Sequence, residues 1–117
     1  MTKAKARVTP LGGLSYQPRF EHGDVAEVSG ITGTDDGTTL GTGMVRMTRA
    51  EIPWTIRYDE VILILEGKLE IDTAEGTLVA NAMETIWLPA GTELVYRAEH
   101  ALMFYAIHPA NWAEDTT

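Results

Sequence analysis

Glu60 is the residue whose type and position are best suited to chemistry. Side chains alternate between the two faces of an extended strand, so Glu60 shares a face with the apolar Ile62 and Ile64. A carboxyl group buried on such a face has a raised pKa, which suits general acid/base work or the holding of a cationic ligand group. The competing interpretation is a carboxylate at the mouth of a barrel, satisfied by Arg57, Tyr58 or backbone amides.

Aromatic side chains predict a ligand cavity around Glu60. Small-molecule pockets are mostly apolar with a few placed polar groups, and four residues fit that description: Trp54, Tyr58, Tyr96 and Tyr105. Glu60 and Tyr58 are the predicted catalytic pair if the protein is an enzyme. Each aromatic residue is also compatible with plain core packing, because the interior of a small barrel is filled by side chains.

Histidines offer a second kind of candidate. His22, His100 and His108 show no recognised metal-ligand spacing. His108 has the best claim to bind a ligand, because it ends an apolar run beside Pro109–Trp112 and titrates near neutral pH. A relocated divalent-metal site that uses His108 with Glu60 or Glu51 stays open.

Composition excludes several classes of protein. The 117 residues fit one domain, and the absence of Cys excludes disulfide frameworks, thiol catalysis and Cys-ligated zinc. The net charge is −8, with +1 over residues 1–50 and −9 over residues 51–117, which disfavours nucleic acid and anionic membranes as partners. No stretch approaches the roughly 20 apolar residues of a membrane span, and no apolar run follows the basic start. We therefore expect a cytoplasmic protein.

Short apolar runs separated by Gly, Asn and Pro predict the elements that position these residues. They indicate an antiparallel sandwich or barrel, and the runs cover residues 40–48, 60–66, 68–72, 77–80, 85–88, 94–97 and 102–107. Glu66–Lys68 is the predicted hairpin turn, and residues 32–38 are the predicted flexible connection after a strand near Val25–Val28. Residues 61, 63 and 65 are apolar as well, so the strand that carries Glu60 is expected to be covered on both faces.

The skeleton of these elements resembles the cupin superfamily. Its marks are a strand opening with Glu60, Gly67 after six intervening residues, and a turn with Pro89 and Gly91. The resemblance implies an all-β double-stranded β-helix, that is, a jelly-roll barrel. The three His that hold the metal in metal cupins would align with Trp54, Ile56 and Leu94. The usual cupin metal is therefore not expected, because one carboxylate is a poor site by itself.

The residues of three segments give a more specific resemblance. Trp54–Val61, Leu65–Leu69 and Pro109–Trp112 resemble the ethanolamine-utilisation EutQ family, which also replaces the metal-binding His. The resemblance covers roughly residues 40–112. It implies a role in ethanolamine utilisation and an acetate kinase-like activity, although the sequence has no Gly-rich phosphate cradle with an adjacent Lys.

Together these observations predict a single-domain cupin barrel that forms a homodimer. Residues 1–38 are the expected arm, strand and connection, residues 39–112 the barrel and residues 113–117 a tail. The predicted function is to hold a small organic ligand in the barrel, without a cofactor, at Trp54, Glu60, Tyr96, Tyr105 and His108. The alternatives are an enzyme that uses Glu60 and Tyr58 or a non-standard metal, and a catalytically silent assembly module.

Overall fold

The chain folds almost entirely into antiparallel strands. The computed structural model describes residues 3–19 and 23–114. Its strands are β1 (Gln17–Pro18), β2 (Ala26–Thr32), β3 (Gly41–Thr55), β4 (Asp59–Thr73), β5 (Gly76–Asn81), β6 (Thr85–Leu88) and β7 (Glu93–His108). Three single 3-10 turns accompany them: η1 (Leu11–Gly13), η3 (Thr34–Asp36) and η4 (Trp112–Glu114).

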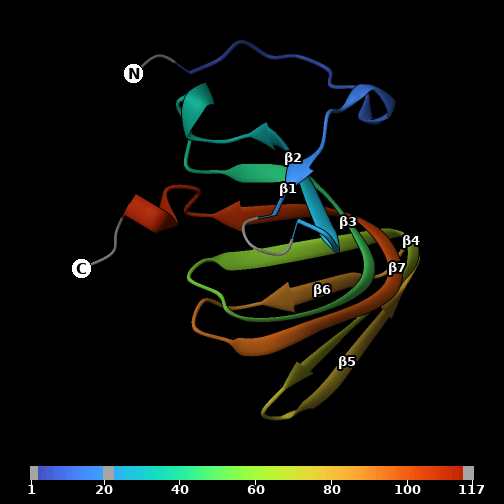
Figure 1. Ribbon diagram of the computed structural model, residues 1–117. Helices are drawn as coiled ribbons and strands as arrows, with labels where there is room; N and C mark the ends of the chain where they lie inside the picture. Colours follow the sequence, from blue (N-terminus) through green and yellow to red (C-terminus); the bar gives the residue numbers. More distant parts are fainter. Residues whose placement is uncertain (1–2, 20–22, 115–117) are drawn as a thin grey trace.

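One seven-stranded sheet connects these strands in the order β1-β2-β3-β7-β4-β5, and β6 pairs with β4. The three long strands β3, β4 and β7 bend as they cross the molecule, so that the sheet closes around a common interior (Figure 1). The predicted all-β jelly-roll barrel is confirmed. The described residues form no helix that is long and apolar enough to span a membrane.

The long strands correct one detail of the sequence interpretation. Glu66–Lys68 is not a hairpin, because β4 runs without a break from Asp59 to Thr73. Gly67 instead adopts a φ of 79° where the β4–β7 register shifts, which is the behaviour of a bulge. A β-carbon there would meet the carbonyl oxygen of His100, so both the conformation and the space require glycine. The runs at 94–97 and 102–107 likewise belong to the single strand β7.

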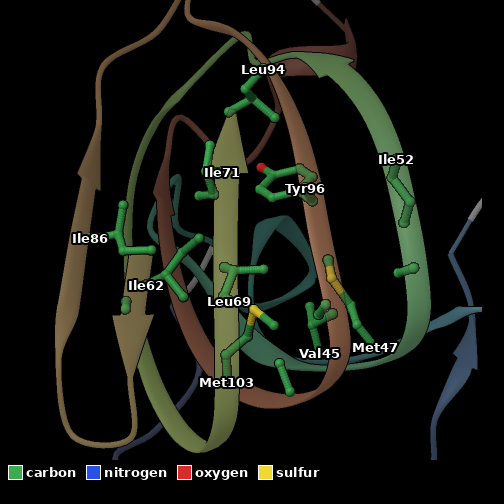
Figure 2. Close-up of a cluster of buried hydrophobic side chains, with 14 of the residues drawn as sticks. Val45, Met47, Ile52, Ile62, Leu69, Ile71, Ile86, Leu94, Tyr96 and Met103 are labelled. Carbon is green, nitrogen blue, oxygen red and sulfur yellow. The ribbon is translucent and has the colours of Figure 1, made fainter. Parts of the chain in front are cut away.

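The core lies on the inner face of the barrel. Its side chains come from β3, β4, β6 and β7 and point toward one another: Val45, Met47, Ile52, Ile62, Leu69, Ile71, Ile86, Leu94, Tyr96 and Met103 (Figure 2). Ile52, Leu69 and Ile71 are fully buried. Each such side chain contributes about 1.5–3 kcal/mol of burial free energy, so this face holds the barrel closed.

The outer face of β4 is apolar, and one chain leaves it partly exposed. Val61 is 43% exposed, and Trp87, its cross-strand neighbour on β6, is 58% exposed. Leu63 and Leu65 are half-buried. Within one chain, β4 is therefore covered on its inner face only, and its outer face is apolar and open.

The N-terminal part joins the same sheet. The strand expected near Val25–Val28 is confirmed as β2, which pairs with β3. The connection over residues 32–38 is more ordered than predicted, since η3 forms there. Its Asp36 carboxylate accepts a hydrogen bond from the Gly33 backbone N–H at 3.0 Å and pairs with Arg7 at 3.1 Å.

Candidate functional site

A cavity of about 200 Å³ lies inside the barrel beside Glu60. Its walls are mostly apolar, and its polar groups are few. The lining residues are Arg19, Val28, Val45, Met47, Tyr58, Glu60, Ile62, Tyr96, Met103, Tyr105, Ile107 and Trp112. This combination of an apolar wall and convergent polar groups is typical of a small-molecule site.

Glu60 reaches the cavity through strand alternation. It pairs in register with Leu88 of β6 and Ile107 of β7, and it faces inward together with Ile62. The side chain is 7% exposed, and its Oε1 accepts a hydrogen bond from the Tyr96 hydroxyl at 3.1 Å. Burial raises the pKa of Glu60 to about 7, although the Tyr96 hydrogen bond and the charge of Arg19 act in the opposite direction. At neutral pH the carboxyl group is therefore close to half protonated.

Three tyrosine hydroxyls surround this carboxyl group. Burial and the nearby Glu60 raise the pKa of Tyr58 to about 12 and that of Tyr96 well above its usual value. The same two causes raise the pKa of Tyr105. All three hydroxyls keep their protons at neutral pH, so each can donate one hydrogen bond.

Arg19 and Trp112 complete the cavity from outside the barrel strands. The Arg19 guanidinium lies 5.1 Å from the ring centre of Trp54 and 5.8 Å from that of Tyr96, within cation–π range. Trp112 lies 5.3 Å from the Tyr58 ring and 6.0 Å from the Trp54 ring, edge to face in the second pair. The C-terminal turn that carries Trp112 is anchored to the barrel by a bond from the Ala110 N–H to the Thr39 carbonyl, 2.7 Å long.

The structure brings most of the predicted site residues together. Glu60, Tyr58, Tyr96 and Tyr105 all line the cavity. Trp54 does not line it; its ring stands behind Arg19 and Trp112.

The histidine predictions fare differently. His108 is exposed and lies outside the cavity, where its Nε2 is 3.0 Å from the Thr39 hydroxyl. Its neighbour Ile107 faces inward, so alternation points His108 outward. Glu51 lies at a separate surface hollow with His100, and His22 is outside the described residues.

Arg19 and Trp112 are functional candidates that the sequence analysis missed as site residues. Arg19 precedes β2 in a segment with no periodic pattern, and no sequence signal places it at the cavity. Trp112 belongs to the Pro109–Trp112 motif, but the motif does not show in which direction the Trp112 side chain points. Their positions depend on how two terminal segments pack against the barrel.

The cavity does not fit the metal that cupins usually hold. Two of the three positions expected for the imidazole ligands, Ile56 and Leu94, carry buried aliphatic side chains, and the third is Trp54. Among residues 3–19 and 23–114, no group of three or more His, Cys, Asp or Glu side chains is close enough to hold a metal ion. The single carboxylate of Glu60 is too weak a ligand to hold such an ion by itself.

Comparison with known proteins identifies the family. The family model of the ethanolamine utilisation protein EutQ matches residues 14–114. The chain belongs to the EutQ family. The "Acetate kinase EutQ" of Salmonella typhimurium strain LT2 is 31% identical in an alignment of 115 residues that covers 90% of this chain and 50% of that protein. The chain therefore spans half the length of this relative.

Solved structures support the fold. The Clostridium difficile EutQ protein superposes with a TM-score of 0.72 at 26% identity, covering 78% of this chain and 67% of that one. The Cnp3 cupin domain of Schizosaccharomyces pombe gives a TM-score of 0.69 at 15% identity, covering 90% of this chain and 75% of the other. The predicted cupin fold and the predicted EutQ family are both confirmed.

Proposed function

We propose that this EutQ-family cupin holds a small organic ligand in the Glu60 cavity, without the usual cupin metal. The observation that carries the proposal is the state of the Glu60 carboxyl group. It is buried, and its Oε1 accepts a hydrogen bond from the Tyr96 hydroxyl. No other side chain among the described residues donates a hydrogen bond to it. Burying a carboxyl group is costly, and a ligand group that donates a second hydrogen bond to it would offset that cost.

The size and polarity of the cavity limit the class of ligand that fits. About 200 Å³ is below the roughly 300–1,000 Å³ of drug-sized sites. The walls formed by Val45, Met47 and Met103 favour a compact apolar body. We infer a small molecule whose hydroxyl or amino group donates to Glu60 and whose body contacts these apolar side chains, with the Tyr105 hydroxyl available as a second polar contact.

The test is a binding titration with n-propanol, n-butanol and n-propylamine as probes. Methyl groups of Met47 and Met103 report on the cavity by carbon-13 NMR, and Met83, 74% exposed, serves as the internal control. We expect Glu60→Gln to weaken binding about tenfold, because the amide N–H₂ would face the donor of the probe. Glu66→Gln, at an exposed position of the same strand, should leave it unchanged. Absence of any shift at Met47 and Met103 in the wild type would refute the proposal.

Acid/base catalysis by Glu60 and Tyr58 is the second candidate function. A carboxyl group with a pKa of about 7 exchanges protons readily at neutral pH, which favours it as general acid or base. Tyr58, with a pKa of about 12, would act only as a hydrogen-bond donor. An enzyme of this kind should lose turnover in Glu60→Gln while the variant stays folded. The acetate kinase activity named for the full-length relative is a weaker candidate here, because this sequence has no Gly-rich phosphate cradle with a Lys.

We also propose that the chain forms a homodimer through the outer face of β4 and β6. The support is the exposure of Val61 and Trp87 side by side on an otherwise apolar face. Trp87→Glu should convert the species seen in sedimentation from a dimer to a monomer. If it does so while Glu60→Gln changes neither binding nor turnover, the assembly-module alternative is favoured. The cytoplasmic location stays a prediction.

A further inference from the structure

A second hollow adjoins the cavity at the mouth of the barrel. It has a volume of about 460 Å³ and shares three lining residues with the cavity, namely Tyr105, Ile107 and Trp112. The remainder of its wall is Gly41, Ala110, and the end of β2 with the η3 turn, from Gly30 to Asp36. Figure 1 places this turn and the C-terminal turn at the same end of the sheet. We call this hollow the outer groove.

Two glycines keep the outer groove open. A β-carbon at Gly30 or Gly33 would meet no atom within 4 Å, so neither glycine is required by close packing. Gly43 is different, because a β-carbon there would lie 2.5 Å from the Tyr105 hydroxyl oxygen. Gly30 lies beside Gly43 in the β2–β3 register, and Gly43 lies against Tyr105, which lines both hollows. The space at Gly30 and Gly33 is therefore available to a ligand.

The charge of the outer groove is negative. No Lys, Arg or His is among the described residues that line it. The Asp36 carboxylate is already paired with Arg7 and with the Gly33 N–H. Asp35 is exposed and has no ion-pair or hydrogen-bond partner among the described residues. An ammonium group in the groove would complement Asp35.

We propose that the outer groove receives the far end of an elongated ligand whose near end is held at Glu60. This inference rests on the proposed function and adds the ligand class, a linear molecule with a hydroxyl or amino group at the near end and an ammonium group at the far end. The chain of the ligand passes Tyr105, Ile107 and Trp112, the residues common to both hollows. Asp35 then acts as a specificity-determining residue outside the barrel.

Linear ω-amino alcohols of three to eight carbons test the proposal against n-alkanols of equal length. Both series are titrated with the Met47 and Met103 methyl signals as the readout. Once the chain is long enough to reach the groove, we expect the amino alcohol to bind about three- to fivefold more tightly than its n-alkanol, the range of an exposed ion pair. Asp35→Asn should remove this gain, whereas Glu75→Gln, an exposed acid on the β4–β5 turn, should keep it.

Gly30→Leu provides a steric test in the same titration. The leucine should fill the passage and abolish the gain of long probes while short n-alkanols still bind. Gly12→Leu is the matched control, because Gly12 also has open space around it but lies outside the groove. Parallel curves for the two series at every length, or an unaltered gain in Gly30→Leu, would overturn the inference and leave the proposed function standing. If no probe shifts Met47 or Met103, both fail.

Discussion

Two of the acidic groups on strand β4 have opposite surroundings, Glu60 near its beginning and Asp72 near its end. Glu60 is buried, and one neutral phenol donates to it. Asp72 is partly exposed and accepts bonds from Arg97 at 2.7 and 2.8 Å and from Thr77 at 2.7 Å. Burial raises the pKa of Glu60 to about 7, whereas the hydrogen bonds from Arg97 lower the pKa of Asp72 to about 2.

The difference indicates that Asp72 has a structural role, whereas Glu60 is suited to binding or proton transfer. Arg97 also bonds to Glu70 at 2.6 Å, so the Asp72 end ties β4 to β7 by paired charges and leaves no acceptor that needs a ligand. Glu60 has no such cation within hydrogen-bond distance among the described residues, and its charged form is disfavoured. A strongly perturbed acid in a cavity is the pattern of a functional site.

The largest effect should appear in the pH dependence of stability. The pKa of Glu60 is near 4.5 unfolded and about 7 folded, so between these values the folded state binds more protons. The free energy of unfolding should therefore fall by about 3 kcal/mol, from this group alone, as the pH rises from 4 to 8. Denaturant unfolding of wild type and Glu60→Gln at each pH isolates the contribution, because other groups cancel in the difference. A constant difference across this range would contradict the assignment.

Tyr96→Phe should give the next largest effect. It removes the hydrogen bond that lowers the pKa of Glu60, so that pKa should rise above 7, and the loss of stability that begins near the unfolded pKa of 4.5 should continue to higher pH. At pH 8 most of the wild-type carboxyl group is charged and accepts this bond, so the variant should be about 1 kcal/mol less stable than wild type, and the deficit should shrink at pH 5. Tyr105→Phe is the control, since no hydrogen bond joins its hydroxyl to Glu60. Equal behaviour of the two variants would break the comparison.

Asp72→Asn should give the smallest effect, with the opposite dependence on pH. The pKa of Asp72 is lowered from 3.8 to about 2, so its stabilising contribution is complete above about pH 4 and is lost as the pH falls through 2. Wild type should exceed the variant in stability at pH 7, and the two should converge near pH 2. Because Asp72 and Arg97 are partly exposed, 1 M salt should reduce the difference. A difference that persists at pH 2 would argue against ion pairing as its cause.

Strand alternation predicted the centre of the site. The inward direction of Glu60 followed from its parity with Ile62, and that of Tyr96 from its parity with Leu94; the structure buries all four side chains. Alternation also indicates that the His108 side chain points out of the barrel. The β7 register with β4 is unbroken over residues 103–108, so Tyr105 and His108, three residues apart, cannot both point inward.

Other features depend on contacts that one sequence does not display. Arg19 enters the cavity because the segment before β2 packs across the barrel, and Trp112 enters because its turn is bonded to Thr39. A glycine between apolar runs indicates either a hairpin or a bulge. Only the register shift beside the Gly67–Ala101 pair shows that Gly67 is a bulge.

The most direct test of the account is the titration of the Glu60 carboxyl carbon by NMR, with the signal assigned from its loss in Glu60→Gln. The account predicts a midpoint near pH 7 in the wild type, and a higher midpoint in Tyr96→Phe. A midpoint near 4.5, the ordinary value for glutamate, would contradict it. Glu60 would then be a solvated carboxylate at the barrel mouth, and the distinction from Asp72 would disappear.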